Sequence, residues 1–570
     1  MRSCTVRKYC IEELVFIILQ RRVRPQGVRT REARVNQVLE FSERDAGFRT
    51  TIIGGMPAIA ILTFGFLILA LVQLTDFTIS GKPTRDLVWI IGVTQVAVYA
   101  WIRARSRLDL KRQVTVLSII YGLQLCLYCA VDVDGFMGGG RPILVWRWNS
   151  STGQQWEDYQ APVGCPTEAA GADLNATTIF DSPGFRGADR SGRLAAVQLD
   201  LQRAHRPKQL WRQPLGRGWS SFSVVGDFCI TQEQRDQYEC VVCYELLSGR
   251  EVWCHKDNAC FEEITGGQGP RATPTIHDGK VYALGATGIL NCLAGEDGAR
   301  IWNSNVLVDA NSENALFGMS GSPLVIGELV IVCPGGRNAS VVAYNAHTGD
   351  QVWAGGQSGA SYSSPQATVI GGRMQILSFN AEGLFSHDSQ SGQVLWSFPW
   401  VSNPSEKNNV GQPIVFTSPG RQQAEVFISS GYGKGATLLK VSAQAGRFSV
   451  REIWRNRNLK AKFSSAVAQQ GYIYGLDDRI LVCIEVATGR RCWKRGRYGY
   501  GQIVLAGETL IVQAESGEIV LVDATPERHH ELARFSALRD RTWNHPVLCG
   551  DVLLVRNDRE AACFRLPRVW

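Results

Sequence analysis

The sequence predicts an all-β eight-bladed propeller that follows an α-helical transmembrane region. Three observations support this prediction: a short motif that returns along the C-terminal two thirds of the chain, a set of similar strand openings between its copies, and an uncharged apolar run near the N-terminus. The predicted domains are a basic segment at 1–50, a transmembrane region at 51–131, a linker at 132–207 and a propeller at 208–570.

The recurring motif is a glycine four places before a tryptophan. It reads YNAHTGDQVW at 344–353, and the same interval returns in four further copies. Each copy predicts a β-hairpin, because an apolar run leads into a Ser/Thr/Asp and glycine turn and a second strand-like run follows. Two more strand-like runs precede each hairpin, so each repeat predicts a four-stranded blade. A looser copy ends at Trp454, and a degraded copy at 522–535 lacks both the glycine and the tryptophan.

The first strand of each repeat begins with a similar short sequence. These openings read WSSF, ATP, GSP, SSP, GQP, SSA, GQI and NHP, which makes eight openings for seven contiguous hairpins. The eighth blade is complete if the C-terminal strand AACFRL pairs with the early strand around Trp211. Such closure removes the exposed sheet edges that would recruit other strands. We therefore expect eight blades between 208 and 566, with seven as the alternative.

The repeat consensus [A/C]-[Y/L]-[D/N/E]-x-x-[T/S]-G-x-x-x-W resembles the PQQ-like repeat. That repeat is shared by quinoprotein alcohol dehydrogenases and by the non-catalytic outer-membrane assembly lipoprotein of the BamB type. The resemblance covers about two thirds of the chain and implies that each repeat tryptophan docks against the neighbouring blade. The tryptophans with this implied structural role are Trp211, Trp253, Trp302, Trp353, Trp396, Trp454 and Trp493.

A stretch near the N-terminus predicts a membrane span. Residues 50–75 contain no charged side chain, and about 20 such residues cross a bilayer. The stretch begins after an Arg-rich leader, too late for a secretory signal peptide. Two weaker candidates follow at 87–102 and 114–131, and the first of these is short enough to be an interfacial or re-entrant segment instead.

The charge pattern predicts the orientation of these spans. Residues 1–50 hold eleven Lys and Arg against six acidic residues, and the loop at 103–113 is also basic. The positive-inside rule places both in the cytoplasm. Three spans then make the chain a multi-pass protein of a bacterial inner membrane, with its propeller in the periplasm. The residues after 131 have almost no net charge, so nucleic acid is not an expected partner.

Two further segments have open interpretations. Cys483 and Cys492 face each other if Glu485 pairs with Arg490, which would allow a disulfide, whereas a register slip of one residue would separate them. The Gly- and Arg-rich segment at 181–193 is either a packed loop that closes one end of the ring or a binding segment that acts through Arg186 or Arg190.

Two functions of different classes fit such a propeller. In the quinoprotein dehydrogenases that the repeat resembles, PQQ would lie over the axis with a Ca²⁺ ion and an aspartate base, and two adjacent cysteines would form a ring over the cofactor. This sequence has no Cys-Cys dipeptide, and its strand openings have no acidic residue. A non-catalytic binding or scaffold module is therefore preferred, with an envelope protein or peptide as its partner and no cofactor. PQQ-dependent oxidation of an alcohol or sugar is the alternative.

The strand openings also suggest where a ligand would bind. Residues in and next to them should gather at one end of the axis, where an arginine, aromatic rings, hydroxyl groups and amide groups would form a polar pocket. A lone histidine such as His545 is more often a hydrogen-bonded structural residue than a ligand-binding one. The candidates are Arg271, Trp219, Ser221, Ser322, Tyr362, Ser364, Gln412, Gln502, Trp543, Asn544 and His545. No catalytic residue and no metal ligand is predicted.

Overall fold

The computed structural model describes residues 130–146, 171–194, 199–200 and 206–568, apart from 176, 264, 404–406 and 418–421, together with a few isolated positions between 115 and 126. The chain divides into two compact units at Cys129/Ala130, and the described elements belong to the second. Within the described part, no helix combines the length and the apolar character that a bilayer crossing needs. The spans predicted at 50–75 and 87–102 lie outside the described residues, as does most of 114–131.

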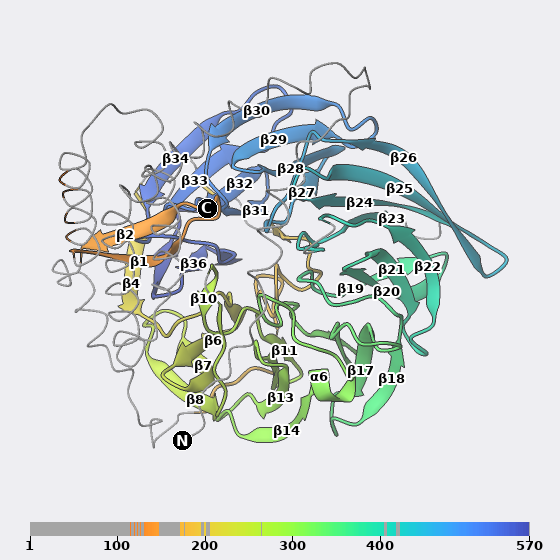
Figure 1. Cartoon of the computed structure of the whole chain (residues 1–570), viewed down its shortest axis with the longest axis horizontal. Helices are drawn as coiled ribbons and strands as arrows, with labels where there is room; N and C mark the ends of the chain where they lie inside the picture. The colour runs from red at the N-terminus through yellow and green to blue at the C-terminus, as the bar shows by residue number, and fades with distance from the viewer. Residues whose placement is uncertain are drawn as a thin grey trace, which may run out of the picture. The chain divides into compact units, whose positions relative to one another are not determined.

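Eight antiparallel sheets surround a common axis (Figure 1). Blade 1 contains β5 (Ser223–Val225), β6 (Phe228–Arg235), β7 (Tyr238–Glu245) and β8 (Glu251–Asp257). Blade 2 contains β11 (Thr275–His277), β12 (Lys280–Leu284), β13 (Ile289–Ala294) and β14 (Arg300–Asn305). Blade 3 contains β15 (Leu324–Ile326), β16 (Leu329–Val332), β17 (Val341–Asn345) and β18 (Gln351–Gly355). Blade 4 contains β19 (Gln366–Ile370), β20 (Arg373–Asn380), β21 (Gly383–Asp388) and β22 (Val394–Pro399).

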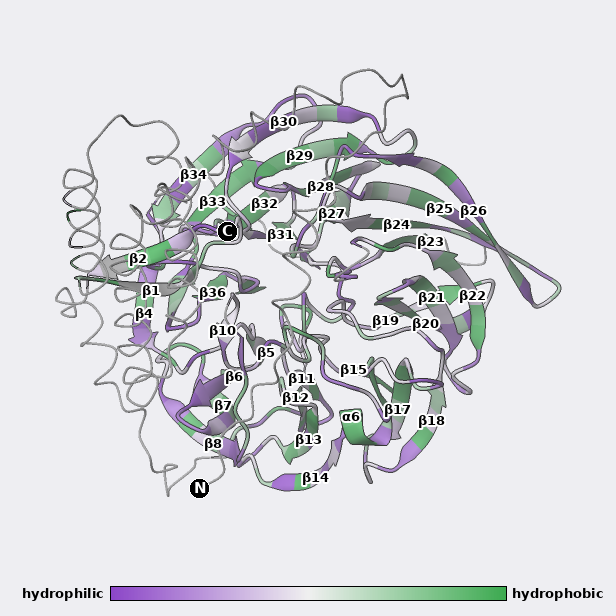
Figure 2. Cartoon of the chain, viewed as in Figure 1, coloured by the Kyte–Doolittle hydropathy of each residue, from purple (hydrophilic) through white to green (hydrophobic). Residues whose placement is uncertain are grey.

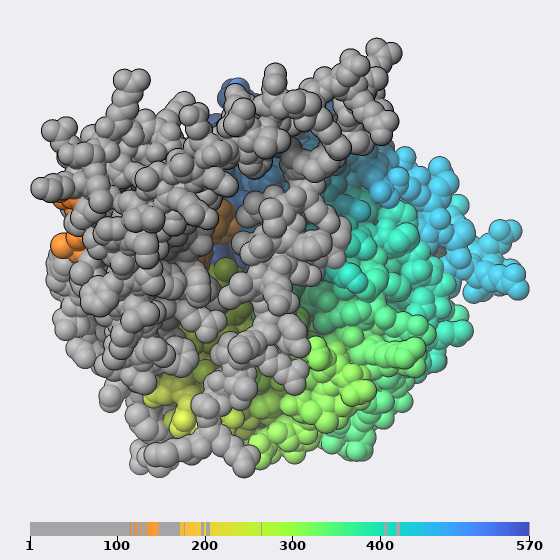
Figure 3. Space-filling view, viewed as in Figure 1, coloured from red at the N-terminus to blue at the C-terminus, as the bar shows by residue number. Residues whose placement is uncertain are grey.

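The second half of the ring continues this pattern. Blade 5 contains β23 (Ile414–Thr417), β24 (Gln423–Ser430), β25 (Gly435–Gln444) and β26 (Arg447–Asn456). Blade 6 contains β27 (Val467–Gln469), β28 (Tyr472–Asp477), β29 (Ile480–Glu485) and β30 (Arg491–Arg497). Blade 7 contains β31 (Gln502–Ala506), β32 (Thr509–Gln513), β33 (Glu518–Asp523) and β34 (Glu531–Ser536), and β3 (Arg193–Leu194) joins it beside β31. Figure 3 shows the long β25–β26 hairpin projecting beyond the ring.

The predicted closure of the ring is confirmed. Blade 8 contains β35 (Val547–Cys549), β36 (Val552–Arg556), β37 (Glu560–Arg565) and β4 (Lys208–Pro214). The last strand of the chain pairs antiparallel with β4, and Cys563 lies opposite Trp211. The two ends of the propeller sequence therefore share one sheet, and the ring has eight blades rather than seven.

Apolar side chains gather between neighbouring blades. One such cluster joins Leu554 and Cys563 of blade 8 to Val224 and Tyr244 of blade 1, and all four are buried. Figure 2 shows that many inner strands are more hydrophobic than the outermost ones, which alternate apolar and polar side chains. Burial of apolar surface between sheets thus stabilises the ring blade by blade.

The repeated glycine and tryptophan meet across blade boundaries. The indole Nε1 of Trp302 donates to the Ala346 carbonyl oxygen of the next blade at 3.0 Å. A Cβ on Gly349 would lie 2.7 Å from that indole ring, and Gly349 has φ 78°. Glycine is therefore required both by its backbone conformation and by the ring beside it. Trp211, Trp253, Trp353, Trp454 and Trp493 likewise donate to a carbonyl oxygen of the following blade.

Trp396 is different, and the sequence of the next blade explains why. Its Nε1 donates to Gln375 Oε1 of its own blade at 2.9 Å. The following repeat is the looser copy, whose hairpin is ten residues long on each strand and turns at Ala445 and Gly446 instead of at the usual position. The turn of blade 5 is thus displaced from the position at which a carbonyl oxygen of the other blades accepts the tryptophan N–H.

Cys483 and Cys492 do not pair directly. Glu485 N–H donates to the Arg490 carbonyl oxygen as the hairpin requires, but a bulge follows and sets Cys483 opposite Trp493. Both cysteines are free thiols in this structure. A register shift of one residue therefore determines which residue lies opposite Cys483, because side chains alternate between the two faces of a strand.

Two segments of the predicted linker dock onto the ring. The strands β1 (Val131–Phe136) and β2 (Pro142–Trp146) form a two-stranded hairpin that joins no blade. The segment at 181–194 crosses one end of the ring, from Ser182 beside Val224 of blade 1 to β3 beside β31 of blade 7. The remaining elements are the short pair β9 (Glu262–Glu263) and β10 (Gly267–Gln268) and the helix α6 (Val306–Asp309). The linker therefore contributes ordered parts to both ends of the axis.

Candidate functional site

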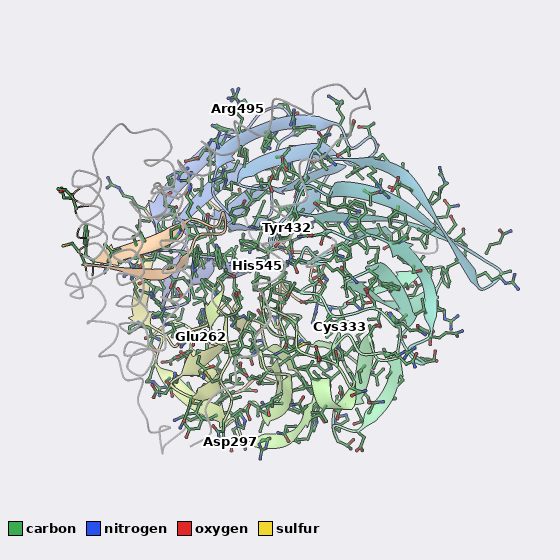
Figure 4. The ribbon with its side chains drawn as sticks, viewed as in Figure 1. Glu262, Asp297, Cys333, Tyr432, Arg495 and His545 are labelled. Atoms are coloured by element: carbon green, nitrogen blue, oxygen red, sulfur yellow. The ribbon has the colours of Figure 1, made fainter. Side chains whose placement is uncertain are left out.

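Three layers of side chains follow one another along the axis. The layers can be read from the chain itself, because each inner strand passes through them in sequence. In blade 6 the order is Phe463, then Ser465, then Ala466. In blade 8 it is Trp543, then Asn544, then His545. We call the end at which the inner strands begin the upper end. In Figure 4, His545 lies near the centre of the ring, whereas Asp297 and Arg495 lie at its rim.

The middle layer is a belt of hydrogen bonds between neighbouring blades. Ser221 N–H donates to Thr273 Oγ1 at 3.1 Å, Thr273 N–H donates to Ser322 Oγ at 2.9 Å, and Ser322 N–H donates to Ser364 Oγ at 2.9 Å. Gln412 Nε2 continues the belt to the Ser364 carbonyl oxygen at 2.9 Å. These residues, of which all except Thr273 were predicted to bind a ligand, are buried and join each blade to the next.

The belt closes through the last two blades. Gln502 Nε2 donates to the carbonyl oxygens of Phe463 and Trp543, both at 2.9 Å. Asn544 Nδ2 donates to the Ser220 carbonyl oxygen at 2.7 Å, which links blade 8 to blade 1. Three side-chain oxygens are buried and accept no hydrogen bond from the residues that the structure describes: Gln412 Oε1, Gln502 Oε1 and Asn544 Oδ1. The amide nitrogens therefore donate to main-chain carbonyl oxygens of the ring, and the amide oxygens remain available as buried acceptors.

The lower layer is a plug built from the Gly- and Arg-rich segment. Arg186 donates to the carbonyl oxygens of Ile503 at 3.1 Å and Ala466 at 2.8 Å. Arg190 donates to Ser322 O at 3.0 Å, to Pro365 O at 2.8 Å and to Pro323 O. Both arginines have left-handed backbones, with φ 61° and 62°, and are buried. Of the two interpretations of this segment, the structure shows the packed loop that closes one end of the ring.

Burial of the two plug arginines affects their titration and that of His545. Burial lowers the pKa of Arg186 to about 10 and that of Arg190 to about 9, so both remain charged at neutral pH. His545 packs edge-on against Phe185, with ring centroids 4.9 Å apart. Burial, and next the charge of Arg186, holds the pKa of His545 well below its usual range. His545 is therefore neutral and belongs to the plug, below the site predicted for it.

The upper layer is a cluster of aromatic and charged side chains. Trp219 and Trp543 stack with centroids 4.8 Å apart, and Phe463 contacts both Tyr500 and Trp543 at 5.2 Å. The Arg541 guanidinium lies 4.5 Å from the centroid of Trp543, and Lys462 Nζ lies 4.9 Å from that of Tyr500, which are cation–π geometries. We call this set the upper cluster: Trp219, Lys462, Phe463, Tyr500, Glu515, Arg541 and Trp543.

The turn between β1 and β2 rests in the upper cluster. Gly138 N–H donates to Glu515 Oε1 at 2.7 Å, and Lys462 Nζ donates to the Gly138 carbonyl oxygen at 2.7 Å. Arg541 Nη1 donates to the Phe136 carbonyl oxygen at 2.6 Å. Every one of these bonds is to the main chain of the turn. The cluster therefore binds a polypeptide backbone of defined shape.

Hydrogen bonds hold the binding groups of the cluster in position. Glu515 Oε1 also accepts from Trp543 Nε1 at 3.0 Å, and Glu515 Oε2 accepts from Tyr500 N–H at 3.1 Å. Asp558 faces Arg541 at 3.5 Å and Arg217 at 3.2 Å. Burial raises the pKa of Asp558, but the nearby arginines outweigh this effect and leave the pKa below its usual value. Asp558 is thus a carboxylate that holds Arg541 against the turn.

The other predicted upper residues lie beside this cluster. The Arg271 guanidinium lies 4.5 Å from the Phe261 centroid and donates to the Gly267 carbonyl oxygen at 2.7 Å. Burial lowers the pKa of Arg271 to about 10. Tyr362 packs on Phe317 with centroids 5.6 Å apart. The structure thus brings Trp219 and Trp543 together in the upper cluster, while Arg271 and Tyr362 contact neighbouring loops.

Sequence reasoning missed the main contacts of the turn. Lys462, Phe463 and Tyr500 stand immediately before the predicted openings in blades 6 and 7, where an aromatic residue precedes the belt as it does in WSSF and TWNH. That shared position was a usable signal. No such signal marks Glu515, because it lies in a turn between β32 and β33, away from the strand openings, and only the folded ring brings it to the axis.

The upper cluster does not fit the cofactor set of a quinoprotein. Ca²⁺ needs six to eight oxygen ligands, and the carboxylates near the axis are already bound to main-chain N–H groups and arginines. Glu239 likewise accepts from Ala286 N–H at 3.0 Å and from Thr287 Oγ1 at 3.1 Å. Across the described residues, His, Cys, Asp and Glu form no group of three that could hold a metal.

Comparisons with known proteins agree with the architecture. Residues 190–495 match the family model described as outer membrane protein assembly factor BamB. The chain is 23% identical over 299 residues to the BamB of Shewanella oneidensis, covering 50% of this chain and 71% of that protein. It is 24% identical over 297 residues to the BamB of Bordetella pertussis, covering 51% and 67%. The quinohemoprotein alcohol dehydrogenase of Comamonas testosteroni has a similar fold, with a TM-score of 0.52 at 13% identity over 69% of this chain and 82% of that one.

Proposed function

We propose that this chain, which belongs to the family of the outer membrane protein assembly factor BamB, is a non-catalytic propeller that binds segments of other polypeptides at the upper end of its axis. The observation that supports this most is the contact between the upper cluster and the turn at 137–140. Three charged side chains there bind main-chain groups only. Main-chain recognition between aromatic walls suits a polypeptide ligand better than a small alcohol or sugar.

The partner class follows from the family. The relatives named above are assembly factors of outer membrane proteins, so we infer that the ligands of this chain are envelope proteins or peptides. The basic leader and the apolar run at 50–75 support an inner-membrane anchor with the propeller in the periplasm. An anchor in the inner membrane would limit reach, so capture of polypeptides before they cross the periplasm suits this chain better than action at the outer membrane itself.

The location can be tested with Cys260, which is exposed. A membrane-impermeant maleimide should label Cys260 in cells whose outer membrane alone has been opened, and the Cys260→Ser variant should report the background. Labelling that appears only after the inner membrane is also disrupted would place the propeller in the cytoplasm and contradict this part of the proposal.

The binding function is tested with the purified full-length chain. An unfolded outer-membrane β-barrel polypeptide carrying a fluorophore should show saturable anisotropy with it, and an unfolded soluble protein of similar length should bind more weakly. Calorimetry with PQQ and Ca²⁺ should give no saturable heat, and an artificial electron acceptor should not be reduced with alcohols or sugars. Stoichiometric PQQ binding with turnover would instead make this chain a quinoprotein with unusual ligands.

A further inference from the structure

We propose that the upper cluster is a receptor for glycine-containing β-turns, which the turn at 137–140 occupies in this structure and which a turn of the same kind in another polypeptide occupies when that internal turn leaves. The inference rests on the proposed polypeptide-binding function and specifies its site and its ligand. It has three supports: the steric limit at Gly138, the placement of charge around the turn, and the weak attachment of the hairpin elsewhere.

The cluster selects glycine at one position of the turn. A Cβ on Gly138 would lie 2.6 Å from Tyr500 Cδ2 and 2.7 Å from Phe463 Cζ, which is closer than a Cβ atom approaches another heavy atom in proteins. Both rings are held by stacking within the cluster and cannot easily move away. Gly139 differs, because its Cβ would lie 3.7 Å from Tyr500 Cε2, an ordinary van der Waals contact. The rings therefore distinguish two neighbouring glycines.

The turn itself requires a second glycine. Gly140 N–H donates to the Met137 carbonyl oxygen at 2.8 Å, which closes the β-turn, and Gly140 has φ 77°. This left-handed conformation favours glycine. The ligand pattern is therefore x-Gly-x-Gly, in which the first glycine is fixed by the receptor and the second by the turn.

Charge completes the recognition of the first glycine. Glu515 accepts its N–H at 2.7 Å and Lys462 donates to its carbonyl oxygen at 2.7 Å, so both main-chain groups of one residue meet a side chain of matching polarity. Gly138 is buried, and hydrogen bonds to charged groups in a buried place are stronger than neutral ones. Any polypeptide that presents the same turn offers the same two groups, whatever its other side chains.

The internal turn is attached in a way that permits exchange. The β1–β2 hairpin joins no blade, and Leu144 is 59% exposed. A two-stranded hairpin is marginally stable in water by itself, so its position depends on the turn contacts. A competing turn of a partner can replace those contacts without opening of the blades.

The test uses a synthetic peptide that copies residues 131–146, cyclised to hold the hairpin and labelled with a fluorophore. It is titrated with the full-length chain and with two matched variants, Gly138→Ala and Gly139→Ala. We expect Gly138→Ala to bind the peptide about tenfold or more tightly than the natural chain, because its own turn no longer competes. Gly139→Ala should bind like the natural chain. Hydrogen exchange of residues 131–146 measures directly whether the internal turn has left the site.

Variants of the peptide test the glycine pattern without altering the fold of the chain. A peptide with Ala in place of Gly138 should lose at least tenfold in affinity for the Gly138→Ala chain, whereas Ala in place of Gly139 should change little. Lys462→Met in the Gly138→Ala background should also weaken binding. Failure of the natural peptide to bind a chain whose internal turn is released would overturn the receptor proposal, as would equal binding of both alanine peptides.

This outcome is separable from failure of the proposed function. If the unfolded barrel polypeptide binds the chain but the hairpin peptide neither binds nor competes with it, the binding function stands and the glycine-turn site is wrong. If neither ligand binds, both proposals fail.

Discussion

The two ends of the propeller axis are closed by the same stretch of chain in different ways. At the lower end, Arg186 and Arg190 reach main-chain carbonyl oxygens of blades 3, 4, 6 and 7, and the segment continues into blade 7 as β3. At the upper end, the turn at 137–140 makes a few contacts, and its hairpin joins no blade.

This difference indicates that the segment at the lower end is a structural part of the ring, whereas the turn at the upper end binds as a ligand does. The plug arginines donate to buried carbonyl oxygens of four blades, so removing them affects the ring itself. The cluster that holds the upper turn is partly satisfied without it, because Glu515 keeps bonds to Trp543 and Tyr500, and Arg541 keeps Asp558. The lower closure should therefore contribute to global stability, and the upper one to local order and binding.

The largest expected effect is that of Arg190→Met. Methionine fills similar space but leaves the buried carbonyl oxygens of Ser322 and Pro365 without the Arg190 donor, while Pro323 O keeps the bond from Thr275 Oγ1. We expect the free energy of unfolding to fall by about 3–5 kcal/mol, measured by denaturant unfolding of the full-length chain. Arg193→Met is the comparison, since the Arg193 side chain is exposed and should cost less than about 1 kcal/mol. Equally small losses of unfolding free energy in both variants would show that the plug has no structural role.

The second effect concerns pH and again belongs to the lower end. Because His545 stays neutral in the folded chain, only the unfolded chain takes up a proton there as pH falls below about 6.5. The unfolded state then binds more protons, so stability falls with falling pH. Between pH 7 and 5 the loss from this one group is at most about 2 kcal/mol.

His545→Phe should remove that contribution while keeping a ring against Phe185. The measurement is the difference in unfolding free energy between pH 7 and pH 5, compared for the natural chain and the variant. The other histidines titrate in both proteins and cancel in this comparison. An identical pH dependence would show that His545 titrates normally and that the plug does not exclude its proton.

The recurring glycine and tryptophan predicted the fold closely, because their spacing is a local signal with a physical cause. Gly349 must accept the Trp302 ring of the preceding blade, and the same requirement explains the identical spacing in the five blades that carry it. The pairing of Trp211 with the C-terminal strand followed from counting openings against hairpins. Whether Cys483 lies directly opposite Cys492 could not be predicted, because this depends on a one-residue bulge, which in the structure sets Cys483 opposite Trp493.

The candidate site was predicted less well, for a different reason. Polar residues such as Ser322 and Gln502 were expected to face a ligand. In the ring, each lies beside the neighbouring blade and forms a hydrogen bond with it instead. The residues that bind the turn come from several blades and from the linker. Contacts between Gly138 and Glu515 join residues 377 positions apart, and no pattern within one repeat records such a contact.

The smallest global effect is expected for Lys462→Met at the upper end. This change removes the bond to the Gly138 carbonyl oxygen and the cation–π contact with Tyr500, but the side chain is only partly buried and no blade depends on it. We expect less than about 1 kcal/mol of lost stability, together with clearly faster hydrogen exchange in residues 131–146.

Lys434→Met is the matched control for that variant, because Lys434 makes a similar cation–π contact with Trp400 at 4.7 Å. It should leave exchange in the hairpin unchanged. If Lys462→Met instead lowered global stability as much as Arg190→Met, the upper turn would be as integral to the ring as the plug. The distinction between the two ends would then disappear, and with it the reason to expect that a partner can take the place of the turn.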